Sequence, residues 1–290
     1  MGLRAKFNIL MLAVSVFGVA LFILAANALV NSVAREEVLQ SSRIMMESAA
    51  GARKYTSEQI APLLKPLIGD KFYPQSVSAY AAKRNFDLIH AKFPGFMYRE
   101  AALNPSNPED RASDWEADII NNFRAHPDKE EIWLERSTPT GKILELARPL
   151  VNKPACMECH DRPASAPASM LAIYGDQNGF GWKPGEIIGA QIVSVPMQES
   201  SMRAAQIRNL FVVPFIAFLI LLFVAVNLLL HFVVIRPIER LAKSAEAVSM
   251  GKIDTPEYRY GGSDQLGRLA ASFNRMHRSL VEAFRMLGQD

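Results

Sequence analysis

The sequence contains little cysteine and little net charge. Two cysteines in 290 residues exclude a scaffold held together by several disulfides. A formal net charge of +3, without any run of five or more like charges, predicts no nucleic-acid partner. Residues 7–30 and 210–235 lack Asp, Glu, Lys and Arg altogether. These two charge-free segments exclude an ordinary water-soluble chain.

Each charge-free segment is long enough to cross a bilayer as a helix, which requires about 20 apolar residues. Arg4 and Lys6 precede the first segment, and Arg236, Arg240 and Lys243 follow the second. Because positive charge accumulates on the cytoplasmic side, both termini are predicted to be cytoplasmic. The domain between the segments is then expected in the periplasm of a bacterium, anchored in its inner membrane.

A cleaved signal peptide is the alternative for the first segment, because Ala26-Asn27-Ala28 resembles a small-residue cleavage site. The apolar run is longer than the usual signal core of about 7–15 residues, which favours a retained anchor. The expected organisation is a cytoplasmic N-terminus (residues 1–6), a membrane helix (7–30), a periplasmic domain (31–208), a second membrane helix (209–235) and a cytoplasmic module (236–290).

Both cysteines lie in one motif, Cys156-Met157-Glu158-Cys159-His160. In such a CxxCH motif, the two thiols add to the two vinyl groups of one haem, and the histidine becomes an axial ligand of the iron. A redox dithiol is expected near a βαβ pattern, a zinc site needs a fourth ligand, and a structural disulfide needs no histidine. The motif therefore predicts haem c, attached through Cys156 and Cys159 with its iron on His160.

The residues alone leave the second axial ligand open. The candidates are methionines and histidines of the same domain: Met45, Met46, Met97, Met170, Met197, His90 and His126. Met46 is preferred, because Met46, Ala50 and Arg53 share one helix face, where a ligand, a small residue and a propionate partner would line a pocket wall. Arg148 is a second propionate candidate. An open coordination position would instead bind a diatomic gas.

Hydrophobic patterning predicts helices first and strands afterwards. A long helix over residues 33–64 is expected to end near Pro62 and Pro66. Further helices are expected over residues 76–92 and 113–124, the second opened by the capping box Ser113-Asp114-Trp115-Glu116. Strands are expected over residues 131–137, 142–150 and 187–195, the first two joined by the turn Thr138-Pro139-Thr140-Gly141. This order indicates an α+β domain.

Several short runs of this domain resemble a known family. They are Ala52-Arg53-Lys54-Tyr55-Thr56, Phe72-Tyr73-Pro74-Gln75, Leu103-Asn104-Pro105, Ala147-Arg148-Pro149, the CxxCH motif, Ile173-Tyr174-Gly175 and Gly179-Phe180-Gly181-Trp182. Over residues 35–197 the chain is similar to exported haem c sensor domains with a PAS-like fold, which often precede a signalling module. The resemblance implies His160 as one axial ligand and a residue of the long N-terminal helix as the other. A founding member uses a cysteine there, and this chain has no third cysteine.

The C-terminal tail carries two apolar heptad stripes. Their members are Ile238, Leu241, Ala245 and Val248 in the first, and Leu266, Leu269, Phe273, Met276 and Leu280 in the second. A connector with Gly251, Ile253 and Gly261-Gly262 separates them. Because neither helix can bury its stripe alone, the pattern predicts a parallel four-helix bundle formed by a homodimer. His277 is expected to be solvated.

Three runs of this tail resemble the HAMP linker of bacterial receptors. They are Arg236-Pro237-Ile238-Glu239, Ser263-Asp264-Gln265-Leu266-Gly267 and Phe273-Asn274-Arg275-Met276. Gln265 stands where that family usually has Glu. No kinase or cyclase domain follows, so a separate cytoplasmic output protein is expected as a partner.

These features together predict a membrane receptor. The redox state of the haem, or a small ligand bound to it, changes the periplasmic domain, and the membrane helices pass the displacement to the HAMP module. A membrane-anchored periplasmic c-type cytochrome for electron transfer is the alternative. A single haem without a convergent set of acid and base side chains argues against an enzyme.

Overall fold

The structure is a computed structural model that describes residues 2–139, 141–252 and 254–287. Two residues of the expected turn and connector, Thr140 and Ile253, lie outside these ranges. By its internal contacts the chain divides into two units. One unit is Asn27–Arg208, and the other combines Met1–Ala26 with Asn209–Asp290.

A long N-terminal helix leads into the first unit. Helix α1 spans Leu3–Tyr55 and continues through a π-helical segment, Thr56–Ile60, into α2, Ala61–Ile68. The long helix expected over residues 33–64 is confirmed, but its prolines do not end it. Pro62 stands in the first turn of α2, directly after the π-helical segment. Because proline has no N–H, the helix loses one hydrogen bond there, and the wider π turn takes up the irregularity.

The remaining helices of this unit are shorter. They are α3 (Ser78–Lys92), α4 (Asp114–Ala125), α5 (Met157–His160) and α6 (Ala168–Tyr174), with 3₁₀ turns at Pro74–Ser76, Pro108–Asp110, Pro154–Cys156 and Pro163–Ser165. The predicted start of α4 is confirmed. The backbone N–H and the hydroxyl of Ser113 both donate to the Glu116 carboxylate, each at 2.7 Å.

Four strands form one antiparallel sheet in the order β1-β4-β3-β2. They are β1 (Met97–Ala102), β2 (Ile132–Thr138), β3 (Gly141–Val151) and β4 (Ile187–Pro196). Three of them lie where the sequence predicts strands. The edge strand β1 was not predicted, because Arg99 and Glu100 interrupt its apolar pattern and alanine has a low strand propensity.

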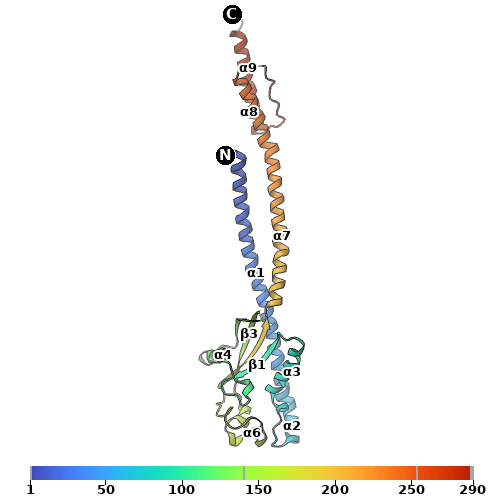
Figure 1. The fold of residues 1–290 in the computed structure, drawn as a ribbon, viewed down its shortest axis with the longest axis vertical. Coiled ribbons are helices and arrows are strands. Elements are labelled where there is room, and N and C mark those ends of the chain that lie inside the picture. Colours follow the sequence, from blue (N-terminus) through green and yellow to red (C-terminus); the bar gives the residue numbers. More distant parts are fainter. Residues whose placement is uncertain (1, 140, 253, 288–290) are drawn as a thin grey trace. The chain divides into compact units, whose positions relative to one another are not determined.

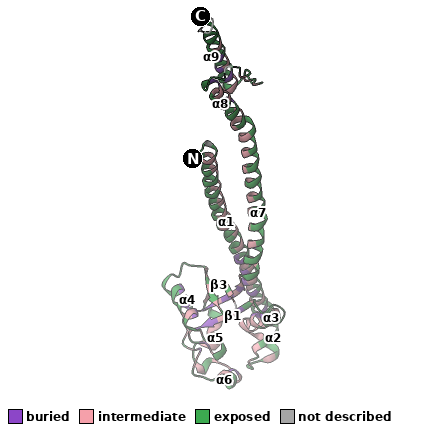
Figure 2. Ribbon diagram, turned by 45° about the horizontal axis from the view of Figure 1, so that its top comes forward, coloured by how far each residue is buried: buried purple, intermediate pink, exposed green. Residues whose placement is uncertain are grey.

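Helices cover both faces of the sheet (Figure 1). Helices α1 and α3 pack on one face, in a core made of Val38, Leu39, Met46, Ala49, Ala82, Phe86, Tyr98, Leu144, Leu146, Val193 and Val195. Helix α4 packs on the other, in a core of Ala101, Ile119, Ile120, Phe123, Ala147, Ile187, Ala190 and Ile192. Figure 2 shows these buried residues gathered along the sheet. Leu146 and Ala147 point to opposite faces, as successive strand residues do.

The second unit contains most of the apolar part of α1 and of α7. Helix α7 (Gln198–Leu229) continues through a π-helical segment, Leu230–Ile235, into α8 (Arg236–Ser249). The continuous helices Arg4–Ile68 and Gln198–Ser249 contain stretches with mean hydropathy 2.8 and 2.9, none of them buried. Both are long and apolar enough to cross a membrane. Phe22 and Phe215 stack with ring centroids 4.3 Å apart.

The tail forms two helices, α8 and α9 (Gln265–Leu287). Leu241, Val248 and Phe273 bury a small apolar cluster between them. His277 is only 4% exposed and stacks on the Phe273 ring, so the expectation of a solvated histidine is wrong. It lies one helical turn after Phe273, on the face of α9 that packs against α8. Other heptad positions, Ile238, Leu269 and Met276, are exposed in the single chain.

Candidate functional site

The CxxCH motif occupies a single helical turn. The 3₁₀ turn Pro154–Cys156 runs directly into α5, Met157–His160. Because residues three apart on a helix lie on the same side, the thiols of Cys156 and Cys159 project from one face. Both are unbonded and half-buried. The fold therefore presents the two thiols together, with His160 directly after the second.

The ring of His160 is held in one tautomer. Its Nδ1 lies 2.7 Å from the carbonyl oxygen of Gly179. A carbonyl can only accept, so Nδ1 carries the proton and Nε2 keeps its lone pair. Burial lowers the pKa of His160, only partly offset by the Gly179 hydrogen bond, which keeps the ring neutral near pH 7. Within the described residues, no group forms a hydrogen bond with Nε2. Trp182 stacks on the imidazole at 4.0 Å and 15°.

The loop that carries Gly179 is held against the loop after β1. The Gly179 N–H donates to Asn104 Oδ1 at 3.3 Å, and the Gly181 N–H donates to the Asp161 carbonyl at 3.0 Å. Gly179 has φ +83°, and a Cβ there would lie 1.9 Å from Ser106 Oγ. Only glycine permits this approach. Both loops contain runs through which the sequence resembles the known family. The sequence alone did not show that these loops position His160.

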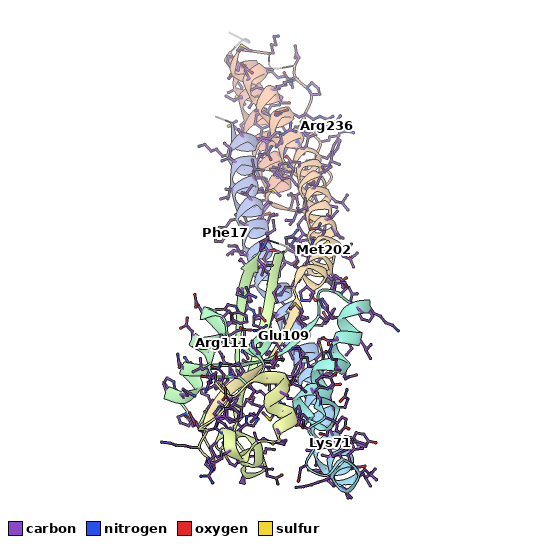
Figure 3. The ribbon with its side chains drawn as sticks, turned by 60° about the horizontal axis from the view of Figure 1, so that its bottom comes forward. Phe17, Lys71, Glu109, Arg111, Met202 and Arg236 are labelled. Atoms are coloured by element: carbon purple, nitrogen blue, oxygen red, sulfur yellow. The ribbon has the colours of Figure 1, made fainter. Side chains whose placement is uncertain are left out.

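The loop after β1 is tied further to its neighbours. Glu109 and Arg111, with Asp110 between them, lie on this loop (Figure 3). Arg111 Nη2 donates to Asn178 Oδ1 at 3.3 Å, next to Gly179. Lys83 of α3 forms an ion pair with Glu109 at 3.0 Å. The surroundings of His160 are thus fixed to both the sheet and α3.

The side chain of Asn152, which is 1% exposed, contacts the cysteine turn at Met157. Its Nδ2 donates to Met157 Sδ at 3.1 Å and to the Lys183 carbonyl at 2.9 Å. These contacts join the end of β3 to the loop before β4. On the surface, Lys65 of α2 pairs with Glu158 at 3.2 Å. The helix α1–α2 therefore contacts the cysteine turn directly.

The other residues that the sequence predicts at the haem, Arg53, Arg148 and Met46, have different surroundings in the structure. Arg53 forms an ion pair with Glu100. Burial opposes the charge of Arg53, but Glu100, Tyr98 and Cys156 outweigh it and raise the pKa of Arg53. Arg53 is therefore held by Glu100, which joins α1 to the edge strand β1.

Arg148 and Met46 have different surroundings. Arg148 pairs with Glu47 at 2.6 Å and with Glu131 at 3.3 Å, between α1 and the start of β2. Met46 is 1% exposed in the core beneath α1. It precedes Arg53 by two helical turns, about 10 Å along the axis. Their roles as propionate partner and sixth ligand stay predictions.

Comparison with known families shows the family to which the chain belongs. A family profile described as Tll0287-like matches residues 31–196. The chain belongs to the Tll0287-like family. A HAMP domain profile matches residues 229–282, so the Tll0287-like domain is followed by a HAMP domain. Both resemblances noted from the sequence are confirmed.

Among solved structures, the Tll0287-like chain matches the "crystal structure of the cyanobacterial heme-protein Tll0287". The two share 18% identity, and the match covers 55% of this chain and 95% of that one, with a TM-score of 0.44. A comparison with curated proteins gives no match.

The core position of Met46 in the Tll0287-like domain permits a direct test. Met46→Ala is expected to lower the free energy of unfolding by about 2–5 kcal/mol, because it empties a fully buried site. Denaturant unfolding measures this loss, and the partly buried neighbour Met45→Ala is the control. If the Met46→Ala protein keeps the wild-type haem absorption spectrum, Met46 is not the sixth ligand.

Proposed function

We propose that this chain is a membrane receptor that senses through haem c attached to its Tll0287-like domain and signals through its HAMP domain. The pairing of these two domains indicates a signal-transduction receptor rather than an enzyme. One observation carries the haem assignment. The hydrogen bond from His160 Nδ1 to Gly179 leaves Nε2 available as a ligand, on the turn that also presents both thiols.

The residues of this turn would each hold a different part of the haem. Cys156 and Cys159 would each form a thioether, and Nε2 of His160 would bind the iron. Gly179 and Trp182 fix the tautomer and the plane of the imidazole, as outer groups do for metal-bound histidines. When bound, the haem would supply a one-electron couple and, at an open sixth position, a site for a diatomic gas.

Two arginines outside the turn are proposed partners of the haem propionates. Arg53 is the first candidate propionate partner, although Glu100 already pairs with it. Arg148 is the second candidate, although two carboxylates already hold it. Met46 is the proposed sixth ligand.

Two covalent connections support transmission to the HAMP domain. Helix α1 runs without interruption from Leu3 to Tyr55, and so includes both the first apolar segment and Arg53. Strand β4 leads into α7, which carries the second apolar segment. A bias of about 1–3 kcal/mol at the haem would suffice to shift a two-state bundle. In this proposal both termini are cytoplasmic, the Tll0287-like domain is periplasmic and PAS-like, and the HAMP domains form the homodimer.

Spectroscopy on full-length protein in membranes tests the proposal. We expect one covalent haem per chain, shown by mass and by the reduced absorption spectrum with and without carbon monoxide. Spin labels in α8 are expected to change their distance across the dimer between the oxidised and reduced protein. An unchanged distance combined with rapid electron exchange with a periplasmic donor would favour the anchored electron carrier instead. A mature chain without haem would overturn the assignment.

A further inference from the structure

Two polar side chains interrupt the second apolar segment, and both lie near its end. Asn227 and His231 are the only residues within 210–235 whose side chains can form hydrogen bonds. They are four residues apart, so they lie on the same side of the continuous helix that α7 and the π-helical segment form. Arg4 and Asn8 have the same spacing on α1. Each of the two helices therefore presents a pair of polar side chains.

These two pairs line one cavity between the helices. The apolar parts of α1 and α7 run side by side (Figure 1) and touch through the stacked rings of Phe22 and Phe215. A cavity of about 400 Å³ between them is lined by all four polar side chains. The rest of its lining is apolar and consists of Phe223, Val224, Leu228 and Phe232. A mostly apolar lining with a few convergent polar groups is typical of a site for a small molecule.

Two polar atoms of these lining residues have no hydrogen-bond partner among the described residues. They are Oδ1 of Asn8 and Nδ1 of His231, and both are buried. Inside a bilayer no water satisfies such groups, so polar side chains there mark functional sites. The last side-chain torsion of asparagine and histidine is soft, so each can turn toward a group bound in the cavity. Asn227 is held by its own helix, because its Nδ2 donates to the Phe223 carbonyl at 3.0 Å.

The lining changes in polarity along the helices. Arg4 precedes the first charge-free segment, so it lies at the level of lipid headgroups in the proposed membrane crossing. Asn8 lies about one helical turn deeper on α1. On the second helix, the apolar residues Phe223 and Val224 lie about one turn deeper than Asn227. A cation, then amides, then apolar side chains follow in the order of the phosphate, the ester carbonyls and the acyl chains of a phospholipid.

We propose that this cavity binds one anionic phospholipid from the cytoplasmic leaflet. This inference rests on the membrane crossing and orientation of the proposed function, and not on the haem. Arg4 would pair with the lipid phosphate, and Asn8 and His231 would donate to phosphate or ester oxygens. An acyl chain spans about 15 Å, half of the hydrocarbon core. The chains would therefore continue past the cavity along α7, where Leu221 is 68% exposed.

The site adjoins the start of the HAMP domain. His231 belongs to the π-helical segment Leu230–Ile235, which leads directly into α8. The HAMP profile begins at residue 229, so His231 stands at the boundary between the membrane helix and that domain. Segments of π-helix are frequent at functional sites. A lipid in the cavity would thus contact the point at which the membrane helix passes into the HAMP domain.

Native mass spectrometry of the full-length protein with defined lipids tests the site. Phosphatidylglycerol is the anionic probe, and phosphatidylcholine with the same acyl chains is the zwitterionic one. We expect each chain to retain phosphatidylglycerol in preference. Arg4→Gln is expected to lower this affinity about fivefold, the usual contribution of one basic side chain near a lipid surface. Asn8→Leu and His231→Leu are also expected to lower it, and neither threatens insertion, because each makes an apolar helix more apolar.

Lys6→Gln is the matched control for the charge of Arg4. Lys6 carries the same charge two residues later on α1 and does not belong to the cavity lining, so its loss is expected to leave the lipid affinity near wild type. Equal losses in Arg4→Gln and Lys6→Gln would overturn the inference, because they would show a general attraction between basic residues and lipid. Equal retention of the two lipids by the wild-type protein would overturn it as well.

Further outcomes identify any other occupant of the cavity. Inorganic phosphate is expected not to displace the lipid, and displacement would show a site for free phosphate instead. If Asn8→Leu and His231→Leu keep the lipid but lower the fraction of dimer, these side chains join two copies of the chain, and the lipid site is overturned. A full-length chain that does not insert into membranes would overturn the proposed function itself. Loss of the lipid preference in an inserted, haem-loaded chain would overturn only this inference.

Discussion

Replacement of Cys156 and Cys159 by serine is expected to abolish covalent haem attachment completely while the domain stays folded. Both thiols lie on one turn and neither belongs to a core cluster, so serine removes the reactive sulfur with little loss of packing. Burial and the nearby Glu158 carboxylate raise the pKa of Cys159, which keeps it a thiol at neutral pH. Intact mass after expression with cytochrome c maturation measures the loss.

A variant within the same turn is the control for this loss. Glu158→Gln changes the charge between the two cysteines and keeps both sulfurs, so it is expected to retain the haem. Its ion pair with Lys65 is largely exposed and contributes little to stability. Covalent haem on the double serine variant would show that these thiols are not the attachment points.

The second large effect is expected from Gly179→Ala. A Cβ at this position would lie 1.9 Å from Ser106 Oγ and 2.7 Å from the Ser106 backbone nitrogen. The loop must therefore move, and the carbonyl that holds His160 Nδ1 moves with it. The left-handed φ of +83° costs about 1–2 kcal/mol, and the steric overlap adds about 1–3 kcal/mol. The free energy of unfolding and the absorption spectrum of the proposed His160-bound haem iron are both expected to change.

Gly181→Ala is the matched control in the same loop. Gly181 has a similar φ of +75°, but a Cβ there would meet nothing within 4 Å. It should therefore show only the backbone cost, about 1–2 kcal/mol, and an unchanged iron spectrum. Equal behaviour of the two alanine variants would mean that contact with Ser106 does not position His160.

Regular structure in this chain is largely readable from local patterns. The capping box at Ser113 and the alternation in β3 and β4 act over a few residues, so they predict elements to within a few positions. Strand β1 cannot be predicted in this way, because its hydrogen bonds come from β4, whose paired residues lie 87–97 positions later in the chain. The burial of His277 could not be predicted from the local pattern, because a heptad pattern does not specify which flanking positions the partner helix covers.

The charge-free segments, the CxxCH motif and the HAMP-like tail are properties of contiguous residues. Hydropathy, the reach of two thiols on one turn and heptad spacing are local, so the amino-acid order alone determines them. The tautomer of His160 and the partner of Arg53 were decided only in the folded domain. Gly179 and Glu100 are distant from these residues in the chain, and a hydrogen bond or ion pair exists only where packing brings its two atoms together.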